Sequence, residues 1–192
     1  MLDSKQQQYF DKLTSIQENL TKETVEYWKV YSDFSTWQFW FILIMLVGPL
    51  ILLFFTIDRK MIFRIGFFGF SVHILFAYIE SFGIRYGFWG YPYQVLPFLP
   101  SFSLDASVIP IVSMLVYQWT INHNKSFFLY SVITAIIFGF GFKPLLVSIN
   151  LFQKDDWVNY FLIFLLYLIL FQLAYLMTKL FLVLHKKGEN NQ

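Results

Sequence analysis

The sequence predicts an all-α integral membrane protein, a bundle of about five transmembrane helices preceded by an amphipathic N-terminal helix. Of its 192 residues, 57% are hydrophobic and only 14% are charged, which leaves too little polar surface to cover a water-soluble globule. Five stretches approach or reach the roughly 20 apolar residues that a helix needs to cross about 30 Å of hydrocarbon. A β-barrel is not indicated, because these runs are too long and do not alternate.

The first 36 residues differ from the rest, since they are rich in charge and show apolar residues at helical spacing. These apolar positions are Leu13, Ile16, Leu20, Tyr27, Val30 and Phe34. The pattern predicts an amphipathic helix over 1–36 that lies on the outer membrane surface or folds onto the loops there. A dimerising coiled coil is the alternative, although Glu23 interrupts its apolar seam and only about three heptads exist.

Residues 37–187 are expected to form the transmembrane domain, followed by a polar tail at 188–192. Its spans are expected at about 37–57, 62–82, 104–122, 126–149 and 157–184. A soluble protein with buried core helices would need polar stripes at helical spacing, and the last stretch has almost none. Pro49 and Pro110 fall inside spans and should kink them.

The distribution of basic residues predicts the orientation, because short loops that carry Lys and Arg stay in the cytoplasm during insertion. Basic residues follow the first, third and fifth spans: Arg59, Lys60, Arg64, His123, Lys125, His185, Lys186 and Lys187. The opposite loops hold only Arg85, and Lys154 beside two acids. We therefore expect the N-terminus outside and the C-terminus in the cytoplasm.

Composition also narrows the chemistry and the partners. The chain has no cysteine, which excludes disulfides, thiolate catalysis and Cys-ligated metal sites. His73 has no second His or acid three or four residues further on, so neither a metal nor another cofactor is predicted. A net charge of +2 without a block of Lys and Arg does not indicate nucleic acid. Membrane lipids are the expected partners, with a hydrophobic small molecule, a membrane protein or a second copy of the chain as alternatives.

Ionisable side chains near the outer ends of the spans are the candidates for chemistry, because each is costly in lipid and marks a partner or a cavity. Glu80, Arg85, Asp105 and Lys143 fall at similar depth, with His73 on the face of Glu80 and about 10 Å deeper. In one interpretation Glu80 and Asp105 are a catalytic acid and base. In the other they form salt bridges, Glu80 with Arg85 and Asp105 with Lys143.

The segment 83–104, which joins the second and third spans, is rich in aromatic residues and proline. Its prolines restrict the backbone, which favours a shaped lid over a slack loop beside the acids. Together with polar groups in the spans, its rings predict a binding site. The candidate binding residues are His73, Arg85, Trp89, Tyr91, Tyr93, Tyr117, Gln118 and Lys143.

One family resemblance rests on this region. The run from Glu80 to Tyr93, with Trp-Gly-Tyr-Pro-Tyr at its end, is followed by Asp105 and by Met-Leu-Val-Tyr-Gln at 114–118. This pattern resembles the CBO0543 family, uncharacterised multi-pass membrane proteins of spore-forming Firmicutes, over roughly residues 37–187. The resemblance implies the bacterial cell membrane and no particular activity. The family commonly has Asp in place of Glu80, and often an acid in place of Gly90 and of Lys143.

A weaker likeness runs to membrane lycopene-cyclase domains, which also pair an acid on one span with an aromatic, proline-containing linker and acids that open the next span. The likeness implies that Glu80 or Asp105 protonates an isoprenoid double bond while aromatic rings hold the cation. The twin acids of that family's second motif are reduced to Asp105 in this chain.

Three functions follow as hypotheses. The first is a membrane protein that binds a lipid-like molecule or a partner protein in a polar, aromatic-lined pocket near the outer leaflet. The alternative is a small terpenoid-cyclase-like enzyme that acts on an isoprenoid or lipid by acid catalysis. The third is a subunit of an oligomeric transporter, since five spans without an internal repeat do not build the usual two-fold transporter alone.

Overall fold

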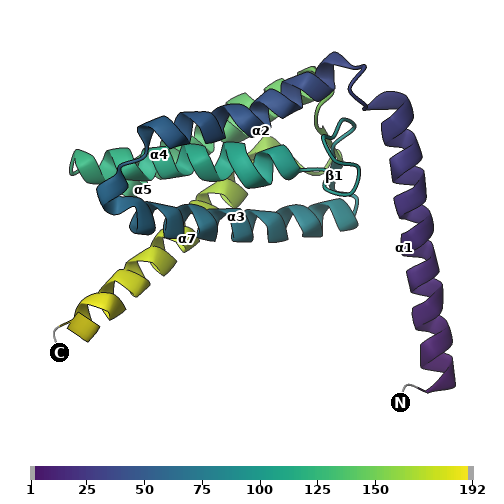
Figure 1. The fold of residues 1–192 in the computed structure, drawn as a ribbon, viewed down its shortest axis with the longest axis horizontal. Coiled ribbons are helices and arrows are strands. Elements are labelled where there is room, and N and C mark those ends of the chain that lie inside the picture. The colour runs from purple at the N-terminus through teal and green to yellow at the C-terminus, as the bar shows by residue number, and fades with distance from the viewer. Residues whose placement is uncertain (1–2, 190–192) are drawn as a thin grey trace.

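The computed structural model describes residues 3–189, and the regular secondary structure in this part of the chain is helical apart from two short strands. Five helical segments are long and apolar enough to cross a membrane, which confirms the predicted fold class. They are Trp37–Thr56, Arg59–Arg85, Leu104–Asn122, Phe127–Ser148 and Tyr160–Gly188, and their ends lie within a few residues of the expected boundaries. They form a bundle with one further helix across its end (Figure 1).

Short π-helical and 3-10 segments extend several of the helices. In chain order, the elements are α1 (Ser4–Tyr31), α2 (Trp37–Thr56), η1 (Arg59–Met61), α3 (Ile62–Arg85), β1 (Trp89–Gly90), η2 (Leu104–Val108), α4 (Ile109–Asn122), α5 (Phe127–Ile136), η3 (Ile137–Phe142), α6 (Lys143–Ser148), β2 (Gln153–Lys154) and α7 (Tyr160–Glu189).

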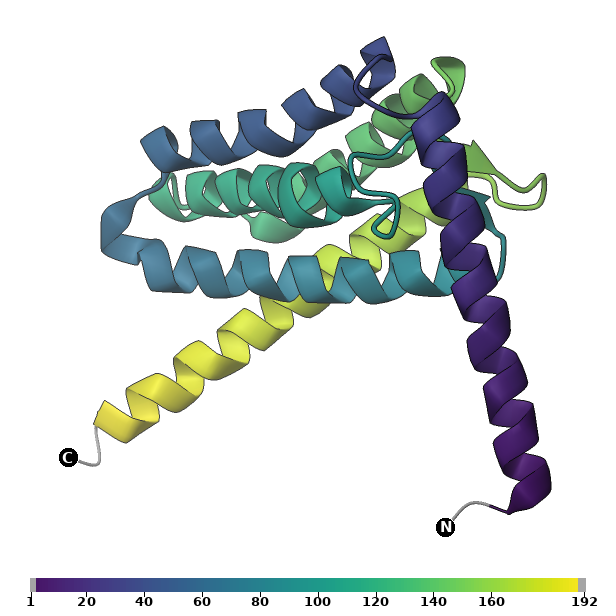
Figure 2. The same cartoon turned by 45° about the vertical axis from the view of Figure 1, so that its right-hand side comes forward.

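The amphipathic helix α1 is not among the candidate spans and runs crosswise at one end of the bundle (Figure 2). None of its residues, all of which the structure describes, is buried. Its C-terminal end is attached to the linker 86–103, since Trp28 Nε1 donates to the Gln94 carbonyl at 2.8 Å and the Gln94 N–H donates to Ser32 Oγ at 2.7 Å. An exposed apolar stripe on such a helix fits a membrane surface.

The turn between α1 and α2 is held by local polar contacts. Asp33 Oδ1 accepts hydrogen bonds from the hydroxyl and the backbone N–H of Ser35, and these bonds lower the pKa of Asp33 because they favour the carboxylate. Thr36 is the N-cap of α2, since its Oγ1 accepts from the Phe39 N–H at 3.4 Å. The turn therefore sets the change of direction between the surface helix and the first span.

The centre of the bundle is α3, which packs against both α4 and α7. Aromatic rings fill the contact: Phe68 stacks on Tyr117 with centroids 4.4 Å apart, and Phe127 meets Phe68 edge-on at 5.3 Å. On the other side, α2 is peripheral, since Ile42 is the only buried residue of that fully described helix. The core therefore lies between α3, α4, α5 and α7.

Two π-helical segments each lead into a proline. Pro110 follows η2 and Pro144 follows η3. A proline ring clashes with the carbonyl four residues earlier and cannot donate to it, and a wider turn before the ring relieves both problems. The sequence predicts a kink at Pro110, and the structure accommodates this proline through η2. Asp105 belongs to η2 and Lys143 directly follows η3, so the wide turns position two charged residues of the candidate site.

A two-residue antiparallel ribbon fixes the linker 86–103. Trp89 pairs with Lys154 and Gly90 with Gln153, and the Asp155 N–H donates to the Phe88 carbonyl at 2.8 Å. The linker is thereby bound to the loop between α6 and α7 as well as to α1. This agrees with the expectation of a shaped segment, and it holds the indole of Trp89 against α3.

Candidate functional site

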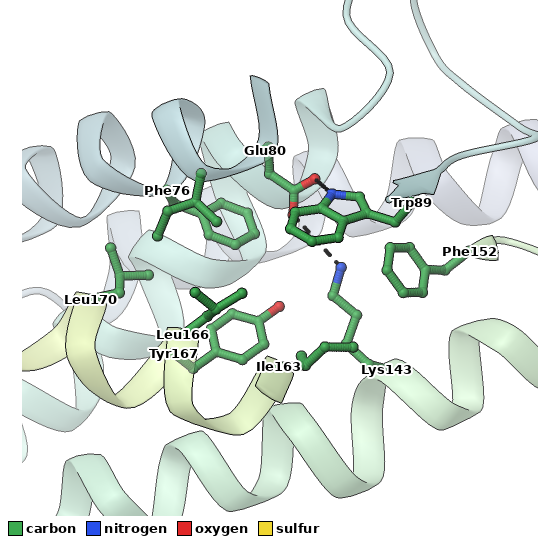
Figure 3. Close-up of a pocket in the computed structure, with 10 residues that line it drawn as sticks. Phe76, Glu80, Trp89, Lys143, Phe152, Ile163, Leu166, Tyr167 and Leu170 are labelled. Carbon is green, nitrogen blue, oxygen red and sulfur yellow. Dashed lines mark hydrogen bonds and ion pairs between the residues drawn. The ribbon is translucent and has the colours of Figure 1, made fainter. Parts of the chain in front are cut away.

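Glu80 is the centre of a buried polar cluster (Figure 3) and lies near the end of α3 that leads into the linker 86–103. It projects from α3 and is only 3% exposed. Its Oε2 accepts two hydrogen bonds at 2.9 Å, one from Trp89 Nε1 and one from the Tyr91 hydroxyl. Lys143 Nζ lies 3.7 Å from Oε1, which completes an ion pair. One carboxylate oxygen is thus hydrogen-bonded and the other faces a cation, and both contacts offset the cost of burying the charge.

Lys143 is equally enclosed and is stabilised by aromatic faces. Its ammonium donates to the Tyr91 hydroxyl at 2.9 Å and lies 3.8 Å from the ring centroid of Phe152. Burial first, and then the negative charge of Glu80, raises the pKa of Tyr91 well above its usual value. The Tyr91 hydroxyl therefore keeps its proton, accepts from Lys143 and donates to Glu80. Cation, hydroxyl and carboxylate form one connected network.

The ion pair differs from the pairing that the sequence suggested. Glu80 is bound to Lys143, not to Arg85, and Asp105 makes no ion pair with Lys143 among the described residues. Arg85 lies five residues after Glu80, about 140° around the helix at 100° per residue, and is exposed. Lys143 begins α6 directly after η3 and is 2% exposed, which turns it into the bundle.

The cluster leaves little room for a ligand. The adjoining cavity measures about 20 Å³, enough for a single water-sized group, and its walls include Phe76, Ile163 and Leu170. The Tyr167 hydroxyl also borders this cavity, is buried, and has no hydrogen-bond partner among the described residues. Glu80 and Lys143 therefore form an enclosed network with room for no more than a water-sized group beside it.

A much larger groove, of about 800 Å³, lies between α1, α3 and the linker. Three candidate residues line it: His73 and Arg85 from α3, and Asp105 from η2. Gln17 and Leu20 of α1 lie on its other side. This volume falls within the range of small-molecule sites. Although His73 and Glu80 are seven residues apart on α3, they border different cavities.

The polar wall of the groove is organised around Asp105. Ser101 Oγ donates to Asp105 Oδ2 at 2.6 Å, whereas Asp105 Oδ1 is buried without a hydrogen-bond partner among the described residues. His73 Nδ1 lies 2.6 Å from the Asp105 carbonyl oxygen. Because a carbonyl only accepts, Nδ1 carries a proton, and Nε2 is an acceptor whenever the ring is uncharged. A buried acceptor without a donor is an unusual feature and marks a place for a ligand donor.

The remaining candidates lie elsewhere. Tyr93 borders a small separate cavity together with Tyr91. Tyr117 and Gln118 lie toward the opposite end: the Tyr117 hydroxyl accepts from Arg64 Nε at 2.9 Å, and Gln118 bonds the backbone of Asp58 at 2.8 Å. The structure therefore separates the ten candidate residues into the Glu80 cluster, the groove, the Tyr93 cavity and this far pair.

Three residues of the site, Ser101, Phe152 and Tyr167, were not among the candidates from the sequence. Ser101 could have been identified, because it lies four residues before Asp105 at the start of the third span. Phe152 lies in the polar loop before the fifth span and Tyr167 lies in a long apolar run, and no motif distinguishes either of them. Among residues 3–189, no three His, Cys, Asp or Glu side chains lie close enough together to hold a metal ion.

No family model, curated protein or solved structure matches the chain. The fold and composition define a multi-pass helical membrane protein, with a surface helix that the linker holds across one end of the bundle.

Proposed function

We propose that this protein binds a lipid-like molecule in the groove formed by α1, α3 and the linker. The observation that carries the proposal is an open groove of about 800 Å³ lined by Asp105, whose Oδ1 is buried without a hydrogen-bond donor among the described residues. The Glu80 cluster has no comparable space. The groove lies between the surface helix and a membrane span, where an amphipathic molecule could enter from lipid.

The groove suggests the chemistry of the ligand. Asp105 and the Nε2 of His73 present acceptors, so the head group should offer hydroxyl or amine donors. Arg85 adds a cation that has no ion pair among the described residues. Apolar side chains, among them Phe98 and Leu99, border the same space and would contact a hydrocarbon portion. A lipid with a hydroxylated or amino head group matches this lining.

Acid catalysis on an isoprenoid or lipid is the second candidate function, and the position of Asp105 favours it. Asp105 lies in a space large enough for substrate and beside an imidazole. Glu80 is less suitable as a proton donor, since it is paired with Lys143 and accepts two further hydrogen bonds. In this proposal Asp105 alone would act.

We also propose that the chain is related to the CBO0543 family, which its sequence pattern resembles, and that it lies in the cell membrane of a spore-forming bacterium.

The experiment is mass spectrometry of the organic extract from gently purified protein, compared with bulk membrane lipid. We expect one lipid-like compound to be enriched in the wild type. A groove variant, Asp105→Asn with Arg85→Gln, should retain no more than about a tenth of the amount that the wild type retains, because it lacks the charge-assisted hydrogen bonds to the ligand. The matched control, Asp156→Asn with Arg59→Gln, changes the same charges at exposed positions outside the groove and should retain it.

Equal retention by the two double variants would contradict the proposal, as would an extract indistinguishable from bulk phospholipid. A compound that is retained by the wild type and chemically altered on incubation, but unaltered with Asp105→Asn alone, would support catalysis instead. Variants that elute as folded monodisperse protein are compared, so that loss of the ligand is not loss of the fold.

We also propose the orientation with α1 outside and the end of α7 in the cytoplasm. Because the chain has no cysteine, single cysteines report their own side of the membrane. Ser4→Cys, in exposed α1, should react in intact cells with a membrane-impermeant maleimide, whereas Gly188→Cys, at the exposed end of α7, should react only after permeabilisation. The reverse labelling pattern would invert the topology.

A further inference from the structure

A second cleft, of about 470 Å³, lies at the opposite end of the bundle from the groove. It separates the beginning of α3, with η1, from the end of α7, where the two helices diverge (Figures 1 and 2). Three basic residues line it, Lys60, Arg64 and His185, and none of its lining residues is acidic. It has no connection with the groove proposed above.

The polarity of the cleft changes along its length. Lys60 and His185 lie near the start of α3 and near the end of α7, whereas Phe67 and Phe181, with ring centroids 4.8 Å apart, form the inner end of the cleft further along both helices. Lys60 precedes Phe67 by seven residues, which corresponds to about 10 Å along a helix. Charged groups near the end of the bundle and rings toward its middle follow the order of head group and acyl chain in a membrane lipid.

The side chain of Arg64 is held in place by Tyr117. Arg64 Nε donates to the Tyr117 hydroxyl at 2.9 Å, and the guanidinium carbon lies 5.5 Å from the centroid of the same ring. This contact occupies one of the five N–H donors of the guanidinium and fixes its plane. The Lys60 ammonium makes no ion pair among the described residues. Lys60 and Arg64 thus present positive charge beside apolar walls, and neither makes an ion pair among the described residues.

We propose that this cleft binds an anionic phospholipid, with the phosphate between Lys60 and Arg64 and one acyl chain along Phe67 and Phe181. Charge complementarity selects this occupant: two cations and no acid favour a phosphodiester with a net negative charge over a zwitterionic lipid. The apolar inner end favours a lipid over a free phosphate. Because the walls belong to α3 and α7, the bound lipid would bridge the two helices.

The test is lipid binding by native mass spectrometry, with delipidated protein titrated with phosphatidylglycerol or phosphatidylcholine of the same chains. Wild type should bind phosphatidylglycerol at least about fivefold more tightly. Lys60→Gln should lower that affinity about fivefold, the effect of removing one cation next to anionic lipid. Arg59→Gln is the matched control, since it removes the same charge one residue away and outside the cleft.

Equal losses in Lys60→Gln and Arg59→Gln would show nonspecific attraction to the basic end of the bundle and would overturn the proposal. Equal binding of the two lipids by wild type would do the same. Competition by water-soluble glycerol phosphate at the same concentration would show a site for the phosphate alone. Lys60 is exposed, so its substitution tests binding without a large effect on folding.

Discussion

Replacement of Lys143 by methionine should destabilise the protein by roughly 3–5 kcal/mol, because Glu80 would remain as a buried carboxylate without its cation. Both partners of this pair are nearly inaccessible, with side chains 3% and 4% exposed, so solvent cannot compensate for the loss. The measurement is the free energy of unfolding, from reversible titration of bicelle-solubilised protein with denaturing detergent.

The double variant Glu80→Gln, Lys143→Met should recover a large part of this loss. A glutamine carbonyl still accepts from Trp89 and Tyr91, and no unpaired charge remains. The matched control is Lys29→Met in the exposed pair of Lys29 with Glu26 at 2.8 Å, which should change stability by less than about 1 kcal/mol. Similar losses in the two lysine variants would refute the buried-charge account.

Substitution of Gly83 by alanine should cost roughly 2–5 kcal/mol. A Cβ atom at Gly83 would overlap the indole ring of Trp89, which rests on α3 at this position. The ring must then move, which combines the cost of overpacking, about 1–3 kcal/mol, with loss of the indole hydrogen bond to the Glu80 carboxylate. The measurement is the same unfolding titration.

Gly66→Ala provides the matched control on the same helix. No atom lies within 4 Å of a Cβ built at Gly66, so the substitution adds a methyl group to open space. Alanine is favoured over glycine in a helix by about 1 kcal/mol, and we expect unchanged or slightly increased stability. A Gly83→Ala variant as stable as Gly66→Ala would mean that Trp89 does not depend on this close approach.

The spans could be predicted from sequence because apolar length is a local property. Trp37–Thr56 has almost no polar residues, and those of Tyr160–Gly188 lie mostly after residue 177, so no knowledge of their neighbours is needed to recognise these spans. The amphipathic pattern of α1 is local in the same way. Its attachment through Trp28 to Gln94 is not, because that contact joins residues 66 positions apart.

The candidate site was predicted only in its composition. Glu80, Trp89, Tyr91 and Lys143 were all identified, yet their mutual bonds depend on the π-helical turn before Pro144 and on the ribbon between β1 and β2. Neither feature has a periodic signal. The separation of Asp105 from Glu80 into another cavity likewise depends on how α1 and the linker cover α3, which no single segment encodes.

The position of the ion pair in the chain has a consequence for biosynthesis. Lys143 follows Glu80 by 63 residues, which at about 5–20 residues per second corresponds to roughly 3–13 s of translation. Trp89 and Tyr91 follow within about 2 s at the same rates. The second span is therefore synthesised several seconds before the cation that pairs with Glu80. During that interval the indole of Trp89 and the phenol of Tyr91 are the first hydrogen-bond partners available to the acid.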